Sequence, residues 1–210
     1  MFTITDVNSR IEQFDKENGP IEWLLTQLFR QFRSNADLSE VLLKTKVLNL
    51  LYSTRIGDVN TVASHIVGLG GIDALLSTGS SDAVSLIANV QIKYRNFCFY
   101  SFATKYCSWH NPAAYPIYDK HVDTCLWFYK KQRLYNKQDP FATFLHQDLW
   151  NYPTFLKVVS AFRGSYGLDS FNFKQLDKFL FYHGEELLSQ GENASGKNAS
   201  GKRVRENAPA

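Results

Sequence analysis

The chain of 210 residues has no apolar run of about 18–20 residues, the length that a membrane-spanning helix needs. Its first residues also lack a charged start followed by an apolar block, so the sequence predicts neither a membrane span nor a secretory signal. Cysteine is scarce and its count is odd: Cys98, Cys107 and Cys125. Without a signal, these cysteines are expected to be reduced thiols, which predicts a cytoplasmic protein.

Signals for strands and for bound cofactors are also weak. No alternating apolar run is bounded by an Asn-Gly or Asp-Gly turn. The sequence contains no Walker loop, no dinucleotide fingerprint and no Gly-x-Ser-x-Gly nucleophile elbow. We therefore expect no nucleotide-binding fold and no cofactor.

Apolar residues instead recur at helical spacing along most of the chain. The expected helices cover residues 21–32, 41–52, 59–67, 80–97, 116–128, 153–162 and 173–187. Pro20, Pro116 and Pro153 stand where a helix is expected to begin, because the first helical position tolerates proline. The predicted fold class is all-α, with one compact helical domain over residues 1–188.

The end of the chain differs in composition from the rest. After Ser189 the sequence repeats Asn-Ala-Ser-Gly-Lys and loses its apolar periodicity. Such a segment buries too little apolar surface to offset the entropy of folding. Residues 189–210 are therefore predicted to form a disordered, mildly basic tail.

Positive charge is concentrated in the middle of the chain. Residues 91–137 carry eight basic and two acidic side chains, whereas residues 1–90 carry seven basic and ten acidic ones. A local basic field attracts polyanions and raises their encounter rate. The alternative is a solvated face with scattered lysines.

Residues 101–123 gather titratable and aromatic side chains around two prolines. Lys105 and Asp119 lie on either side of Asn111-Pro112, so two helices that meet there bring both side chains to one cleft. Basic neighbours and aromatic walls would favour the neutral amine of Lys105, the form that acts as a nucleophile. A carboxylate beside a sugar C1′ stabilises an oxocarbenium-like transition state. Spacing alone favours a plainer alternative, in which a surface lysine and an aspartate each pair with nearby charges.

Two other interpretations use the same segment. Cys107 and His110, together with His121 and Cys125, have the short spacings of a tetrahedral zinc site, although the order Cys-His-His-Cys is less usual. Asp123 lies four residues after Asp119, on the same helical face, and could be the catalytic carboxylate in its place.

The runs 101–107 and 115–122 resemble the helix-hairpin-helix DNA glycosylases, particularly the 8-oxoguanine glycosylase branch. In that family a lysine follows a hairpin that ends in Gly-Thr, and an aspartate after a proline begins the next helix. Thr104-Lys105 and Pro116 with Asp119 match these two features. The expected helix around 47–52 and the turn at 53–56 are also similar to the family. Ser101 and Ala103 replace the hairpin glycines that let backbone N–H groups close on a phosphate.

The resemblance implies a domain of two helical lobes around a central cleft, and an enzyme that flips a base out of double-stranded DNA and cleaves its N-glycosidic bond. Lys105 would attack C1′ or direct the attacking water, and Asp119 would stabilise the developing positive charge; strand cleavage could follow. The implied base pocket consists of Trp109, His110, Tyr115 and Tyr118. The implied DNA contacts are Arg55, Ser101, Thr104 and Lys120.

The resemblance also implies a metal-free monomer, and a role in defence against phage with modified bases is one possibility. The competing class is a non-catalytic helical module that binds nucleic acid or protein, and a zinc-stabilised module is one form of it. Such a module would keep the basic segment, and its binding activity would be unchanged when Lys105 is replaced.

Overall fold

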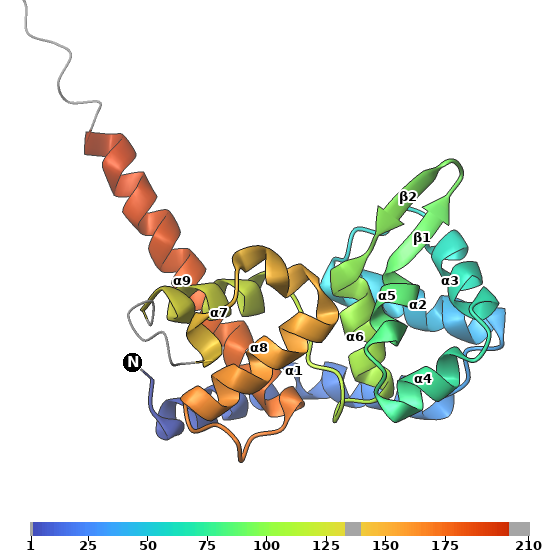
Figure 1. Cartoon of the computed structure of the whole chain (residues 1–210), viewed down its shortest axis with the longest axis horizontal. Helices are drawn as coiled ribbons and strands as arrows, with labels where there is room; N and C mark the ends of the chain where they lie inside the picture. Colours follow the sequence, from blue (N-terminus) through green and yellow to red (C-terminus); the bar gives the residue numbers. More distant parts are fainter. Residues whose placement is uncertain (1, 133–139, 202–210) are drawn as a thin grey trace, which may run out of the picture.

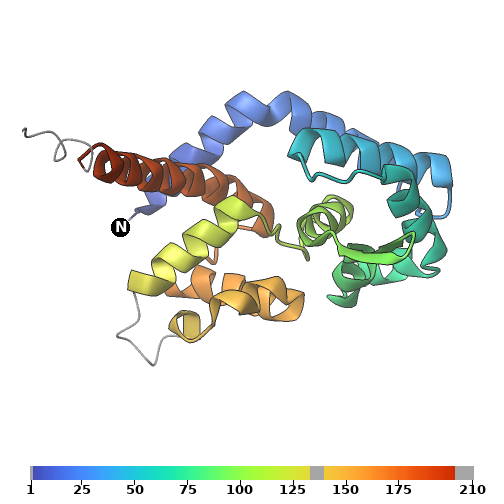
Figure 2. The same cartoon turned by 90° about the horizontal axis from the view of Figure 1, so that it is seen from above.

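The computed structural model describes residues 2–132 and 140–201, and it is mostly helical, as the sequence predicts (Figure 1). The helices form two lobes that are joined by the long helix α1 (Ile4–Gln31). We call residues 38–110 the hairpin lobe and residues 120–201 the C-terminal lobe. Helix α1 runs along both lobes and packs against α6 of the first and α9 of the second (Figure 2).

Helix α1 begins much earlier than expected. Thr3 caps it: its hydroxyl accepts a hydrogen bond from the backbone N–H of Asp6, and the Asp6 carboxylate accepts one from the backbone N–H of Thr3. The prediction that the helix begins at Pro20 is wrong, because Pro20 lies inside α1. The strong cap and the packing against α9 offset the single backbone hydrogen bond that a proline removes.

The hairpin lobe begins with four helices, α2 (Leu38–Tyr52), α3 (Val59–Gly68), α4 (Ile72–Thr78) and α5 (Asp82–Ala88). Asp37 and Asp58 cap α2 and α3 through their side chains, and Gly71 and Gly79 take left-handed conformations at the two ends of α4. Among the described helices no single one is long and apolar enough to cross a membrane; only α3 and α4 together, bent by 84°, meet that test.

A β-hairpin follows α5, where the sequence suggested a helix as far as Phe97. Strand β1 (Asn89–Ile92) pairs antiparallel with β2 (Arg95–Cys98), with Val90 opposite Phe97. The expectation of one helix over 80–97 is therefore wrong after Ala88. Val90 and Ile92 are β-branched and Phe97 is aromatic, and such side chains pack well as cross-strand pairs. The turn lacks glycine and asparagine, so the usual hairpin signal is missing.

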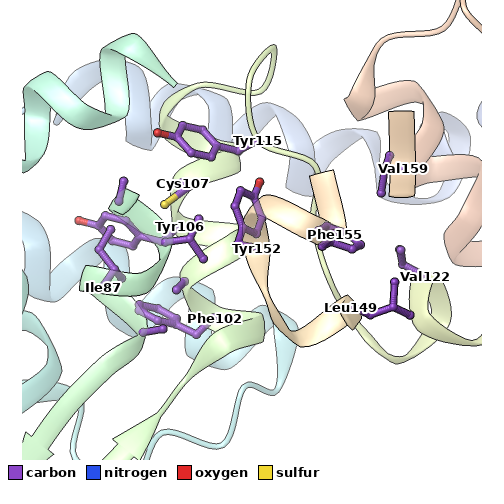
Figure 3. Close-up of a cluster of buried hydrophobic side chains, with 14 of the residues drawn as sticks. Ile87, Phe102, Tyr106, Cys107, Tyr115, Val122, Leu149, Tyr152, Phe155 and Val159 are labelled. Carbon is purple, nitrogen blue, oxygen red and sulfur yellow. The ribbon is translucent and has the colours of Figure 1, made fainter. Parts of the chain in front are cut away.

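Helix α6 (Tyr100–His110) follows the hairpin directly and forms the centre of the buried core. Seven consecutive residues of α6, from Phe102 to Ser108, are buried. Figure 3 shows Phe102, Tyr106 and Cys107 in a cluster that continues through Tyr152 to Phe155 of the other lobe. The two lobes thus share one apolar core.

The C-terminal lobe consists of α7 (Lys120–Gln132), the 3₁₀ helices η1 (Pro140–Ala142) and η2 (His146–Trp150), α8 (Tyr152–Ser165) and α9 (Phe173–Gly201). Helix α7 begins four residues after Pro116, so Pro116 does not open it. Helix α9 continues to Gly201, past the point at which the composition predicts a tail, and residues 202–210 lie outside the described residues.

Helices α7 and α9 pack closely at Gly184. A Cβ atom built at Gly184 would lie 2.4 Å from the backbone oxygen of His121. We predict that Gly184→Ala lowers the free energy of unfolding by about 1–3 kcal/mol, because the clash is with backbone and forces the helices apart. Urea denaturation measures the change. Gly164→Ala in α8 is the control, since a Cβ there meets no atom within 4 Å; equal effects of both changes would contradict the close packing.

Candidate functional site

Lys105 lies on the buried face of α6, at the junction of the two lobes. Its side chain is 4% exposed, and Nζ lies 3.7 Å from Oδ2 of Asp119. Nζ donates a hydrogen bond of 2.8 Å to Oγ of Ser101 and lies 5.3 Å from the ring centre of Tyr52. The structure therefore brings together the lysine and the aspartate that the sequence singles out. The groups that surround Nζ are a carboxylate, a hydroxyl and a ring face.

Asp119 is held in place because it caps helix α7. Its Oδ1 accepts hydrogen bonds from the backbone N–H groups of His121 and Val122, at 2.9 and 3.0 Å. A carboxylate at a helix N-terminus also interacts favourably with the helix dipole. The cap engages Oδ1, while Oδ2 faces Lys105. The side chain is 19% exposed, so Asp119 is the more accessible member of the pair.

Thr104 fixes the segment that carries Asp119 to helix α6. Its hydroxyl donates to the backbone oxygens of Ser101 and Tyr118, and accepts from the backbone N–H of Tyr118 at 3.1 Å. The prediction that Thr104 contacts DNA is wrong, because Thr104 is fully buried. Ser101 binds Nζ of Lys105 through its hydroxyl, so its role in the structure is to orient the lysine.

Asp177 of α9 adds a second carboxyl group to the site, one that the sequence reasoning missed. Burial raises its pKa to about 7; Lys174 and Lys105 oppose the rise, and the negative charge of Asp119 adds to it. A signal was present in the sequence: Asp177 lies four residues after Phe173 and three before Leu180, on the apolar stripe of its helix. The site thus contains one lysine, Lys105 of α6, and two carboxyl groups, Asp119 at the start of α7 and Asp177 of α9.

A groove of about 900 Å³ lies beside this cluster, between α1, α4, the end of α6 and the start of α9. Trp109 and His110, predicted for the base pocket, both line it, but Lys105 and Asp119 do not. The Trp109 indole N–H donates to the hydroxyl of Tyr52, and Nζ of Lys174 lies 3.9 Å from the Trp109 ring centre. Trp109 and Tyr52 therefore connect the groove to the Lys105 cluster.

His110 belongs to a buried polar network around Lys44. Nζ of Lys44 donates to the backbone oxygens of Phe32 and Ser34 and to Oδ1 of Asn35, all within 3.0 Å, and lies 3.4 Å from Nε2 of His110. Burial lowers the pKa of Lys44 to about 8. Burial, with repulsion from Lys44, lowers the pKa of His110 to about 3, so the imidazole is neutral at physiological pH.

Tyr115 and Tyr118 do not line the groove with Trp109. Tyr115 is fully buried, as Figure 3 shows, and its hydroxyl donates to the backbone oxygens of Leu75 and Ser80. The prediction that Tyr115 stacks on a base is therefore wrong; it fills the core because its hydroxyl finds partners there. The Tyr118 ring packs on Tyr100 and Phe155.

Asp123 is separate from Lys105 in its contacts. Its carboxylate accepts a hydrogen bond from the Tyr118 hydroxyl and pairs with His146, each at 2.8 Å. Of the two carboxylates that the sequence left open, the one paired with Lys105 is Asp119.

The zinc alternative is not supported by the geometry. Within the described part of the chain, no three His, Cys, Asp or Glu side chains are grouped so that they could hold a metal ion. Cys107 lies in the core of the hairpin lobe, and the Cys125 thiol donates to the backbone oxygen of Leu180. The His121 ring packs against Phe181.

Arg55 and Lys120, both predicted to contact DNA, are exposed. Arg55 lies in the turn between α2 and α3 with a φ of 60°, and Lys120 is the first residue of α7. Their side chains are accessible to a ligand, and their contact with DNA stays a prediction.

The role of Asp119 as a helix cap leads to a stability prediction. Asparagine caps helices as well as aspartate does, so Asp119→Asn should leave the free energy of unfolding nearly unchanged, whereas Asp119→Ala should lower it by about 1 kcal/mol. Chemical denaturation of the two variants measures the difference. Equal losses would contradict the assignment of the cap.

The raised pKa of Asp177 leads to a prediction about pH. The folded state holds the proton up to a higher pH than the unfolded chain, whose Asp pKa is about 3.9. Stability should therefore fall as pH rises from about 4 towards 7, by up to about 1.4 kcal/mol per pH unit. Asp177→Asn should remove this part of the slope in urea titrations, and Asp169→Asn, at an exposed position, should not. A slope that Asp177→Asn leaves intact would contradict the assignment.

Comparison with known proteins places the chain in a family. A family model described as an N-terminal domain, HI_0787_N, matches residues 6–114, which include Lys105 and end before Asp119. An uncharacterised protein of Haemophilus influenzae is 38% identical over 156 residues, which cover 74% of this chain and 72% of that protein. No solved structure matches the chain at a significant level. The matched segment spans more than half of the chain, and on this evidence the chain belongs to the HI_0787_N family.

Proposed function

We propose that the protein is a DNA glycosylase, which extrudes a damaged or modified base from duplex DNA and cleaves the bond between that base and its sugar. The observation that carries the proposal is the Lys105–Asp119 pair, with Nζ and Oδ2 3.7 Å apart at the junction of the two lobes. The resemblance to helix-hairpin-helix glycosylases rests on the same two residues. The basic segment 91–137 supports DNA as the partner.

Lys105 acts as the nucleophile in this proposal. The neutral amine attacks C1′ of the extruded nucleotide, the C1′–N bond breaks, and its electron pair leaves with the base, which takes up a proton. Asp119 accepts the proton that Nζ must lose, and its carboxylate stabilises the positive charge that develops on the sugar. Because the helix cap holds Oδ1, the carboxylate keeps its orientation during the reaction.

Asp177 supports the same chemistry. A carboxyl group with a pKa near neutrality is suited to exchange protons at physiological pH. Asp119 is held by the cap at the start of α7, and Asp177 lies on the apolar stripe of α9. With its raised pKa, Asp177 carries a proton over a pH range in which an ordinary carboxyl group is ionised.

Access to Lys105 requires movement at the lobe junction. The lysine side chain is only 4% exposed, so an extruded nucleotide reaches Nζ when neighbouring side chains shift. Lys174 on the Trp109 ring joins α9 to α6 beside the groove. The energy of DNA binding would offset the loss of such contacts, as it offsets the unstacking of the base.

The test is base release from duplexes that each contain one damaged or modified base, followed by detection of abasic sites. We predict that Lys105→Ala and Asp119→Asn each lower the rate by about 10²–10⁴-fold while the protein stays folded. Asp123→Asn is the matched control, since Asp123 contacts Tyr118 and His146 and should keep the wild-type rate. Unchanged base release by both site variants would show that the assignment is wrong.

Borohydride trapping separates the two possible roles of Lys105. If the amine bonds to C1′, the C1′–O4′ bond of the sugar ring then breaks, O4′ takes up a proton, and the Schiff base that forms is reduced by borohydride to a stable protein–DNA adduct. Lys105→Ala forms no adduct. If wild-type protein binds DNA but releases no base from any duplex in the series, the non-catalytic binding module replaces the enzyme as the functional assignment. A preference for modified over damaged bases would support a role in phage defence.

A further inference from the structure

We propose that the β1–β2 hairpin is a second contact surface for duplex DNA, in which Lys93 and Arg95 bind phosphates and the Tyr94 ring stacks on a base. The choice of DNA over other polyanions rests on the proposed function. The hairpin projects from the lobe at the end of α6 that precedes Lys105 (Figure 1). The sequence reasoning expected a helix here and so assigned the hairpin no role.

The tip of the hairpin presents two cations and one ring. Ile92 pairs with Arg95, so Lys93 and Tyr94 form a two-residue turn between them. Lys93 has a φ of 55°, a conformation that residues other than glycine seldom adopt. Glycine or asparagine would fit this turn with less strain. The lysine gives the tip a positive charge that those residues would not supply.

Tyr94 is 100% exposed, and no aromatic or cation contact of its ring is found among the described residues. Rings of this kind next to basic side chains stack on the exposed bases of single strands, and in a duplex such a ring stacks where it inserts between two base pairs. Strand β2 is exposed along its whole length, so nothing in the described chain covers this side of the hairpin.

The base of the hairpin is firmly attached, although an isolated two-stranded hairpin is only marginally stable. Val90 is buried and faces Phe97 across the strands, and the Phe97 ring stacks on Phe99 with parallel planes. The opposite face carries Gln91 opposite Asn96, two amides that can donate and accept hydrogen bonds. The hairpin is thus anchored through Val90, and Arg95, opposite Ile92, is exposed on the same face nearer the tip.

The hairpin and the Lys105 site are close enough to contact one duplex. From Lys105 to Tyr100, at the start of α6, is about 7.5 Å of helix, and the six residue steps from Tyr100 to Tyr94 add at most about 20 Å. The tip therefore lies at most about 28 Å from Lys105, a length of about eight base pairs.

The salt dependence of binding tests the two cations. The full-length wild-type protein and the double variant Lys93→Gln/Arg95→Gln are titrated with an unmodified 20-base-pair duplex at several salt concentrations. Loss of two phosphate contacts should reduce the slope of log Kobs against log[salt] by about 1.8 and weaken binding about tenfold or more at 0.15 M salt. Lys16→Gln/Lys157→Gln, at exposed positions of α1 and α8 that do not line the groove, removes the same charge and should leave the slope unchanged. Equal slopes for wild-type protein and the hairpin variant would overturn the proposal.

Two further measurements separate stacking from charge. Tyr94→Ala should weaken binding about tenfold without changing the slope, because stacking releases no counterions, and Tyr94→Phe should bind like wild-type protein. Cys98 is exposed on the hairpin while Cys107 and Cys125 are buried, so alkylation reports on the hairpin alone. Saturating duplex should slow alkylation of Cys98 several-fold. Unchanged alkylation would also overturn the proposal.

The failure of this proposal is distinguishable from failure of the proposed function. If wild-type protein releases no base but the hairpin variants change the salt slope, the hairpin contact stands and the glycosylase assignment fails. If base release depends on Lys105 while the hairpin variants bind and react like wild-type protein, the hairpin proposal fails alone. If the glycosylase assignment alone fails, Lys105→Ala should bind the unmodified duplex with the same slope of log Kobs against log[salt] as wild-type protein.

Discussion

The attachment of residues 115–119 to both lobes is the constraint on which the site depends. The Thr104 hydroxyl binds both backbone groups of Tyr118, and the Tyr152 hydroxyl donates to the backbone oxygen of Pro116. These hydrogen bonds fix the point at which the chain enters α7. Asp119 therefore caps α7 at a set distance from α6, on which Lys105 immediately follows Thr104. Because all these polar groups are buried or partly buried, breaking one leaves an unsatisfied partner, which is costly.

The two buried lysines show how differently one side chain can be accommodated. Lys44 is fully buried, and three oxygen atoms within 3.0 Å surround its ammonium, two of them backbone carbonyls from the turn after α1. Lys44 thus satisfies backbone carbonyl groups in the turn after α1 and connects that turn to α2. Lys105 has one hydrogen bond, to Ser101, and a carboxylate at 3.7 Å. Lys105 thus has fewer oxygen partners than Lys44, and this difference is why the proposed chemistry is assigned to Lys105.

Several elements were predictable because their signals are local. Asp58 as the cap of α3, the glycines that end it, and the start of α8 near Pro153 follow from backbone rules that need no tertiary contacts. The hairpin and the first half of α1 were not predictable in this way. The hairpin turn contains Lys93 and Tyr94 instead of glycine, and α1 continues through Pro20, because packing in the folded protein outweighs local preference in both places.

The sequence by itself determined the helical class and the basic middle segment, and it singled out Lys105 and Asp119 as a candidate pair, since composition, periodicity and residue order are properties of the chain. Only the tertiary structure decided which carboxylate pairs with the lysine, that Tyr115 and Thr104 are buried, and that Asp177 joins the site. The physical reason is burial. Whether a polar side chain is a core hydrogen-bond partner or an accessible reactive group depends on neighbours from distant parts of the chain, here α6, α7 and α9, and residue spacing does not contain that information.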